Sequence, residues 1–99
     1  MNYCSANPSK RGQRAFVKKE LLKLIEVTRA EKACINYNLH QDNENPDLFL
    51  FFEKWENREL WQTHMQNEHL KRYMEVTEGA VEEFVLHEMM HIAQTKSLL

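Results

Sequence analysis

The sequence YNLHQDNENPDLFLFFEKWENRELWQTHMQNEH, residues 37–69, decides the fold of this chain. It contains a short alternating segment, a turn rich in Asn and Asp, and a strongly apolar run that leads to Trp55. A segment that carries Trp61, His64 and His69 follows directly. This order places aromatic rings, a carboxylate and imidazoles where a buried strand meets a helix, and small-molecule pockets tend to form at such places.

Length and composition restrict the class of the protein. Residues 1–99 are enough for a single domain and leave no room for a second core. The formal net charge of -2 gives no general attraction to nucleic acid. The longest apolar run, Leu48 to Phe52, is too short to cross a bilayer, and residues 1–12 lack the apolar core of a signal peptide. We therefore expect one cytoplasmic domain with neither a membrane nor a nucleic-acid partner.

The two cysteines, Cys4 and Cys34, lie far apart and outside any C-x-x-C motif. In a cytoplasmic protein such cysteines are expected to be reduced thiols. A disulfide between them is the less favoured alternative.

Hydrophobic periodicity predicts a helix followed by a hairpin. Residues 14–31 place apolar side chains on one face at helical spacing, with charged side chains opposite. The apolar stripe consists of Val17, Leu21, Leu24, Ile25 and Thr28. Residues 34–40 alternate, which puts Ile35, Tyr37 and Leu39 on one face of a strand. Residues 41–46 predict the turn into a partner strand at 47–55.

The partner strand is apolar on both faces. One face carries Phe49, Phe51 and Trp55, and the other carries Leu48, Leu50 and Phe52. Such a strand must be covered on both sides. The predicted helices suffice for only one face of a sheet of this size. A second copy of the same sheet is the simplest cover for the other face, so we predict a homodimer.

The remaining segments complete a βαββααβ order. Asn57 is a good N-cap for a helix with Leu60, Trp61, His64 and Met65 on one side. Asn67 interrupts that helix, and a second one over residues 68–76 is expected to bury Leu70, Tyr73 and Met74. Residues 82–92 alternate imperfectly and fit either a strand or a helix. With a weak, polar first strand at residues 2–6, followed by Pro8, the order predicts an α+β fold of the ferredoxin-like split βαβ kind.

Residues 87–91, His-Glu-Met-Met-His, match the zinc-protease motif H-E-x-x-H. On a helix the two imidazoles would share a face and chelate zinc while the Glu acts as a general base. On a strand the same imidazoles are roughly 13 Å apart and cannot share one metal ion. The chain is also small for a peptidase of this kind, so we expect no metal site.

Several polar and aromatic residues are candidates for a pocket, and each has a structural alternative. His64 shares a helical face with Trp61, so it points inward, where an imidazole suits a general base or a hydrogen-bond donor. Trp55 and Trp61 fit either a core or a polar-edged pocket wall. Glu53 lies on the Trp55 face and must be paired or functional, because burying it alone is costly. Asn36 fits a pocket, a dimer contact or solvent.

An ordered series of short motifs along the chain resembles a known family. The motifs are Phe16…Leu24-Ile25…Thr28-Arg29-Ala30-Glu31, Cys34-Ile35-Asn36-Tyr37-Asn38-Leu39-His40-Gln41-Asp42, Phe49…Phe52-Glu53-Lys54-Trp55-Glu56 and Leu60-Trp61…His64…His69-Leu70. Together they make the chain similar to the antibiotic biosynthesis monooxygenase domain family from about Lys10 to Ile92. The resemblance implies a ferredoxin-like subunit that pairs through its sheet into a dimeric α/β barrel. It also implies that residues 82–92 form a strand.

The resemblance implies chemistry without a metal or flavin. In quinol-oxidising and polyketide-oxidising members an acidic phenol or quinol is deprotonated in an apolar pocket, and its anion reduces O₂ directly. By position, Trp55 matches the family's strand-end Trp and His64 its helix His. His69 and Tyr73 match positions near the pocket in quinol-type members, and Phe51 stands where polyketide-oxidising members have Asn. Tyr73 and its neighbour occupy the place of the axial His of haem-degrading members, so no haem is expected.

We therefore predict a cytoplasmic homodimer that acts as a cofactor-independent monooxygenase on a small quinol or aromatic phenol. The expected catalytic residues are His64 as base or oxyanion donor, Trp55 as pocket wall and donor, and Asn36 as an orienting group. Trp61, His69, Tyr73 and Phe51 are expected to contact the substrate. The alternatives are a non-catalytic dimer that binds a small aromatic and an isomerase with the same base. An open pocket faced by His64 would favour an enzyme, and one filled by Phe51 and Met65 would favour a binding protein.

Overall fold

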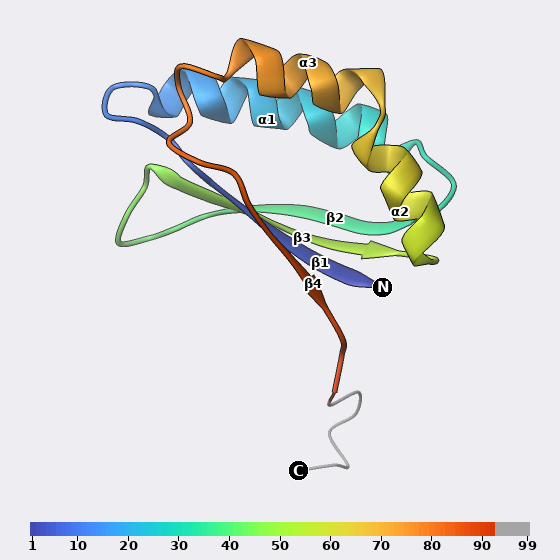
Figure 1. The fold of residues 1–99 in the computed structure, drawn as a ribbon. Coiled ribbons are helices and arrows are strands. Elements are labelled where there is room, and N and C mark those ends of the chain that lie inside the picture. The colour runs from blue at the N-terminus through green and yellow to red at the C-terminus, as the bar shows by residue number, and fades with distance from the viewer. Residues whose placement is uncertain (93–99) are drawn as a thin grey trace.

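The computed structural model describes residues 1–92 and has the predicted βαββααβ order (Figure 1). Its elements are β1 (Asn2–Pro8), α1 (Arg14–Arg29), β2 (Cys34–Gln41), β3 (Leu48–Trp55), α2 (Arg58–Met65), α3 (Glu68–Val76) and β4 (Val85–Met89). The α+β class and the ferredoxin-like arrangement are thus confirmed. Residues 93–99 of the predicted 1–99 domain lie outside the described part.

The four strands form one antiparallel sheet in the order β2-β3-β1-β4. The first strand predicted over residues 2–6 was too short, because β1 runs over seven residues and lies between two partners. Its alternate residues Tyr3, Ser5 and Asn7 are buried although two of them are polar. A strand with polar side chains on its buried face looks like a solvent-exposed strand in sequence, which explains the error.

The three helices cover one face of the sheet, here called the inner face (Figure 1). Side chains from α1, α3, β2 and β3 pack there into a core that includes Leu21, Leu24, Phe49, Phe51 and Leu70. A second cluster near the start of β1 contains Tyr3, Trp55 and Trp61. The Tyr3 and Trp61 rings stack with centroids 3.9 Å apart, and this contact fixes α2 against the end of the sheet.

The helix boundaries follow from local signals in the sequence. The side chain of Asn57 accepts a hydrogen bond from the backbone N–H of Leu60, and Asn67 caps α3 in the same way. These caps satisfy backbone donors that a helix start leaves unpaired. Two expected core residues are exposed instead: Leu60 on α2 and Met74 on α3. Each helix is short, so only a narrow stripe of it faces the sheet.

The β2 strand departs from the simple alternation that its sequence predicts. A bulge lies between Cys34 and Asn36, where the pairing register with β3 shifts. An extra residue in one strand of a pair is left out of the ladder and turned aside. Ile35 is therefore 51% exposed, although the alternation placed it on the buried face with Tyr37.

Residues 85–89 form a strand, which settles the ambiguity left by their sequence. His87 pairs with Cys4 on one face of the sheet, and Glu88 pairs with Tyr3 on the other. The H-E-x-x-H match therefore lacks the helix that it needs for metal binding. Cys4 and Cys34 are free thiols. Among residues 1–92, no helix is long and apolar enough to cross a membrane.

Opposite the helices lies the outer face of the sheet, which no described helix covers (Figure 1). Direct pairing across the strands aligns Asn38, Phe52, Cys4 and His87 in one row of this face. Phe52 is 38% exposed there, and Met89 at the same face is also exposed. The predicted two-faced character of β3 is thus present, with one face buried by helices and the other open in the single chain.

Candidate functional site

His64 is the centre of the polar site, because it is 2% exposed and lies between two carboxylates. The N-cap at the start of α2 and the stacking of Trp61 orient the helix so that His64 faces the sheet. Its Nδ1 lies 2.9 Å from Oε2 of Glu31, and its Nε2 lies 4.0 Å from Oε1 of Glu53. The imidazole also packs on the Trp55 ring, with centroids 4.5 Å apart.

Glu53 is the second member of this group and lies on the inner face of β3. The indole N–H of Trp55 donates a hydrogen bond of 3.0 Å to its Oε1. Burial raises the pKa of Glu53 to about 7, and the negative charge of Glu31 adds to this rise. The hydrogen bonds from Trp55 and Ser5 act in the opposite direction. Glu53 therefore titrates near neutral pH, which suits a group that exchanges protons.

The protonation of His64 follows from its two neighbours. Burial lowers its pKa, while the hydrogen bond and the charge of Glu31 oppose that effect. A neutral imidazole whose Nδ1–H donates to Glu31 carries its lone pair on Nε2, the nitrogen that faces Glu53. Glu31 and Glu53 thus lie on the two ring nitrogens of His64, with a hydrogen bond on the Glu31 side only. Glu31 is half-buried and reaches solvent.

A small cavity lies next to His64, between the sheet and the helices. Its volume is about 10 Å³, which is room for roughly one water molecule. Its polar lining residues are Ser5, Asn7, Tyr37, His64 and Tyr73. Phe51 and Met65 are among the apolar side chains that fill the remaining space. By the criterion set from the sequence, the pocket is closed in the single chain.

The polar residues of this cavity are held in place by buried contacts. The Tyr73 hydroxyl donates a 2.9 Å hydrogen bond to Oδ1 of Asn7, and Tyr37 stacks on Phe51. Burial raises the pKa of Tyr73 to about 12 and raises the pKa of Tyr37 further. Both phenols therefore stay protonated at neutral pH and can donate hydrogen bonds. The amide nitrogen of Asn7 has no hydrogen-bond partner among the described residues.

The structure brings together only some of the residues predicted from the sequence. His64, Tyr73 and Phe51 line the cavity. Trp55 contacts His64 from outside the cavity lining, and its indole N–H is already bound to Glu53. Trp61 is buried against Tyr3 and is not among the residues that line the cavity.

Asn36 and His69 lie apart from this group. Asn36 pairs with Lys54 on the outer face of the sheet, where its side chain is exposed. Asn36 and Tyr37 are neighbours on β2, so their side chains point to opposite faces of the sheet. The bulge next to Asn36 also contributes to its position. His69 is exposed in the first turn of α3, so its ring does not reach the cavity. The structure therefore does not place either side chain near His64.

Sequence reasoning missed Glu31, Ser5 and Asn7. Glu31 lies in the short connection between α1 and β2 and meets His64 from far along the chain. Such a pair leaves no periodic signal in the sequence. Ser5 and Asn7 alternate with Cys4 and Ala6 in β1, and this alternation was a signal for a strand with a polar face. Only their burial reveals that this face points inward.

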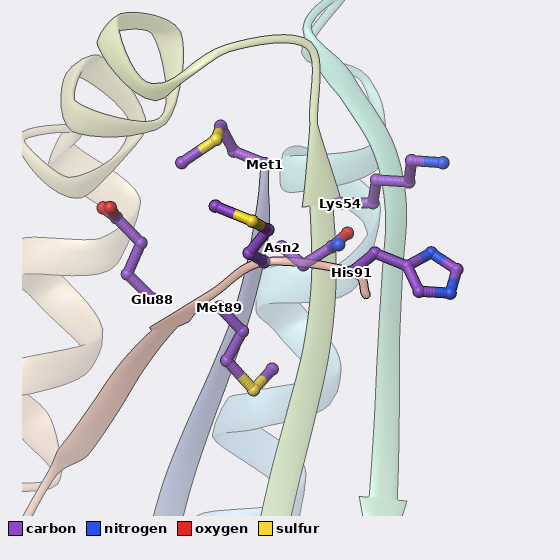
Figure 2. Close-up of a pocket in the computed structure, with 7 residues that line it drawn as sticks. Met1, Asn2, Lys54, Glu88, Met89 and His91 are labelled. Atoms are coloured by element: carbon purple, nitrogen blue, oxygen red, sulfur yellow. The ribbon is translucent and has the colours of Figure 1, made fainter. Parts of the chain in front are cut away.

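A larger hollow lies on the outer face, beside the start of β1 and the end of β4 (Figure 2). Its volume is about 650 Å³, and Met1, Asn2, Lys54 and Met89 contribute to its lining. Lys54 and His91 extend to one side of this hollow, and Glu88 extends to the other (Figure 2). None of these side chains contacts His64, so the hollow is separate from the buried group.

No cluster of three or more His, Cys, Asp or Glu side chains in residues 1–92 is arranged to hold a metal ion. Nδ1 of His64 is within hydrogen-bond distance of Glu31 at 2.9 Å, whereas Nε2 lies 4.0 Å from Glu53, which is an electrostatic contact and too long for a hydrogen bond. What the arrangement offers chemically is therefore a proton acceptor at His64 with a proton donor or acceptor on either side.

Solved structures share this fold closely. A protein from Pseudomonas aeruginosa superposes with a TM-score of 0.88 at 25% identity, covering 93% of this chain and 93% of that one. A protein from Shewanella oneidensis gives a TM-score of 0.81 at 28% identity, covering 87% and 85%. A structure described as an antibiotic biosynthesis monooxygenase gives 0.80 at 25% identity, covering 91% and 98%.

Sequence comparison agrees with these structures. An uncharacterized protein of Synechocystis sp. is 31% identical over 74 residues, which are 75% of this chain and 50% of the relative. The chain therefore spans about half the length of the curated relative that it matches. The family model for the antibiotic biosynthesis monooxygenase domain matches residues 7–76, which include β1 from Asn7 onward, α1, the β2–β3 hairpin, α2 and α3. The chain belongs to the antibiotic biosynthesis monooxygenase family.

Proposed function

We propose that the protein is a cofactor-independent monooxygenase that oxidises a small quinol or aromatic phenol with O₂. The observation that carries the proposal is the buried His64, held between Glu31 and Glu53 beside a cavity that phenolic hydroxyls line. Membership of the family supports an oxygenase. We propose the substrate class and the reaction.

The reaction begins with removal of a proton from the substrate by Nε2 of His64. The resulting anion is electron-rich and transfers electrons to O₂, and one oxygen atom then bonds to the substrate carbon. For an anthrone, the CH₂ group becomes C=O while the second oxygen atom leaves as water. The substrate supplies all four electrons, so no further reductant is needed. Tyr37 lines the cavity and can donate a hydrogen bond to the substrate anion, whereas the Tyr73 hydroxyl already donates to Oδ1 of Asn7.

The two carboxylates have different roles in the proton transfer. Glu31 accepts a hydrogen bond from Nδ1 of His64 and stabilises the imidazolium that forms when Nε2 takes a proton. Glu53, with its pKa of about 7, can receive that proton or return it for the release of water. Trp55 holds the Glu53 carboxyl in this position through its indole N–H.

The closed cavity favours a second candidate function, a protein that binds a small aromatic without converting it. Phe51 and Met65 help to fill the space beside His64, and a volume of about 10 Å³ holds no substrate. A binding protein needs the same polar groups for recognition but has no need for O₂. The two functions differ in one observable, the consumption of oxygen.

We also propose that the protein is a homodimer joined through the outer face of its sheets. The support is the apolar surface that the helices leave open, including the exposed Phe52 and Met89. A second copy of the chain is the natural occupant, because its outer face presents the same apolar side chains. Light scattering at micromolar concentration tests this proposal, and a monomer of normal stability would reject it.

The decisive experiment measures oxygen uptake by the purified, metal-free protein with reduced naphthoquinols and anthrones. His64→Ala is the test variant, and Gln62→Ala, exposed on the same helix, is its matched control. We expect uptake above autoxidation in the wild type and in Gln62→Ala. Loss of a general base predicts a rate lower by about 10²–10⁴-fold in His64→Ala.

Two results would decide against the oxygenase. Uptake that His64→Ala leaves unchanged would remove His64 from the reaction. No uptake across the panel, with binding of the same compounds still detectable, would favour the binding protein. Exchange of a substrate proton without uptake would instead indicate an isomerase that uses the same base.

A further inference from the structure

An open cleft lies directly beside the closed cavity. It has a volume of about 180 Å³ and lies between α3, the end of β1 and the segment that leads into β4. Asn7, Tyr73 and Phe84 line both the cleft and the cavity, so these three side chains form the wall between the two spaces. The cleft therefore ends against the polar group around His64.

Asn7 presents an unused hydrogen-bond donor in this wall. Its side chain is 1% exposed, and the Tyr73 hydroxyl donates to its Oδ1 at 2.9 Å. This bond orients the amide, and its Nδ2 has no partner in the described part of the chain. Burying an unpartnered amide donor costs stability, because the group loses its hydrogen bonds to water. An oxygen atom of a ligand would remove that cost.

Phe84 is the part of the wall that belongs to no helix or strand. It follows residues 82–83, which also form neither, and it directly precedes β4. Before these residues, the backbone is held by the bridge between Ser9 and Val81. A volume of 180 Å³ is below the roughly 300 Å³ of small-molecule pockets. A rotation of the Phe84 ring would join the cleft to the cavity and add the space that the ring now occupies.

The charges of the cleft select among aromatic ligands. Its lining contains two exposed carboxylates, Glu78 and Glu83, and no Lys, Arg or His. Met74, Val81 and Phe84 supply an apolar surface. Negative charge at the rim repels an anionic ligand and leaves a neutral one unaffected. An aromatic carboxylate is therefore disfavoured against an aromatic that carries a hydroxyl or a ketone.

We propose that this cleft admits and holds a neutral aromatic ligand, with Phe84 as its gate and Asn7 Nδ2 donating to the ligand's hydroxyl or ketone oxygen. Phe84 turns aside, the rings of the ligand replace it beside Met74 and Tyr73, and the ligand's far edge reaches the cavity. The inference depends on the proposed function only for the reaction at His64. Binding itself requires neither O₂ nor turnover.

The test is the binding of 2-naphthol at pH 7, measured by its fluorescence and by calorimetry, with 2-naphthoate as the charged counterpart. We expect naphthol to bind at least tenfold more tightly than naphthoate. Asn7→Asp keeps the acceptor for Tyr73 and removes the amide donor, so naphthol affinity should fall about tenfold, the equivalent of one hydrogen bond. Asn43→Asp, exposed in the β2–β3 turn, makes the same chemical change and should leave affinity unchanged.

The gate is tested separately, because a buried substitution at Asn7 can impair folding. Phe84→Ala removes the ring that blocks the cavity and should raise naphthol affinity about tenfold, since the open state no longer has to be populated. Phe84→Trp should lower it. In the wild type, the Asn7 side-chain amide resonances should shift on addition of naphthol.

The proposal is overturned if naphthoate binds as tightly as naphthol, or if the Asn7 amide resonances do not move at saturation. It is also overturned if both Phe84 variants bind like the wild type. Oxygen uptake that persists while these binding results fail would leave the oxygenase standing and place its access route elsewhere. Binding as expected with no oxygen uptake would support the cleft and reject the oxygenase.

Discussion

The two faces of the sheet differ in a way that reverses the usual pattern. At the inner face, below the helices, buried polar residues lie among the core side chains: Ser5, Asn7, Glu53 and His64. On the outer face, Phe52 and Met89 are apolar and exposed. Polar groups in a core and apolar groups at a surface each cost stability unless something compensates. The inner face therefore suits chemistry or ligand binding, and the outer face fits the proposed contact with a second copy.

Neighbouring residues on β3 give the sharpest comparison of the two faces. Phe51 is 2% exposed on the inner face, and Phe52 is 38% exposed on the outer face. Phe51→Asp should unfold the subunit, because it removes about 3–5 kcal/mol of core packing and buries a charge. Phe52→Asp should leave the subunit folded and separate the proposed dimer. Denaturant unfolding and light scattering measure the two effects, and comparable unfolding by both substitutions would contradict the assignment of faces.

The pH dependence of stability tests the buried carboxyl of the inner face. The unfolded chain releases the Glu53 proton near the ordinary pKa of 4.5, and the folded protein releases it near 7. The free energy of unfolding therefore falls as pH rises from about 4.5 to 7 and stays lower above that range. Glu53→Gln lacks this loss, so at pH 8 the variant should be more stable than the wild type by about 3 kcal/mol.

The comparison has an internal control, because the free energies of unfolding of Glu53→Gln and of the wild type should be equal below pH 4.5. His64 has a lowered pKa and destabilises both proteins as the pH falls, so its contribution cancels in the difference. A wild type that is more stable than Glu53→Gln at pH 8 would show that Glu53 is needed as a carboxylate. The proton-sharing description of the site would then be wrong.

A smaller effect is expected from the pair that holds the cavity wall. Tyr73→Phe removes the hydrogen bond to Oδ1 of Asn7 and leaves the buried amide without a protein partner. The expected loss is about 1–3 kcal/mol in the free energy of unfolding, measured with denaturant. Asn36→Ala, an amide lost from the outer face, should change stability by less than about 0.5 kcal/mol. Equal losses would erase the distinction between the two faces.

The smallest effect is expected at Glu88, which lies on the edge strand β4 in the same cross-strand row as Glu53. Glu88 also pairs with Tyr3, but from β4, and its carboxylate is 3.0 Å from Arg58 in an exposed ion pair. Glu88→Gln should cost no more than about 1 kcal/mol, and added salt should reduce the difference. A larger, salt-independent loss would mean that this edge is buried in the protein's working assembly.

The elements of the fold were predictable because their signals are local. The α1 stripe, the Asn57 cap and the alternation of β3 each depend on residues a few positions apart, and all were confirmed. The inward position of His64 followed from its helical spacing to Trp61. The length and central place of β1 did not follow, because Ser5 and Asn7 made its buried face look exposed.

The parts of the site that could not be predicted depend on contacts between distant segments. Glu31 meets His64 only after the hairpin and α2 have folded back over the sheet. The filling of the cavity by Phe51 and Met65 is a matter of side-chain packing, which neither periodicity nor motifs encode. The resemblance to the family supplied His64 and Tyr73 but also His69, whose side chain lies elsewhere in this subunit. Asn36, a candidate because of its place in its strand, also lies elsewhere.

The central place of β1 also makes the sheet depend on pairing between distant parts of the chain. In β1, Asn2 pairs with Lys54 on one side and with Met89 on the other. The β2–β3 hairpin and the helices can form from nearby residues, whereas β1 needs partners that lie far along the sequence. Long-range pairing of this kind slows folding. Since Ser5 and Asn7 belong to β1, the polar cavity has these recognition groups in place only when β1 has paired.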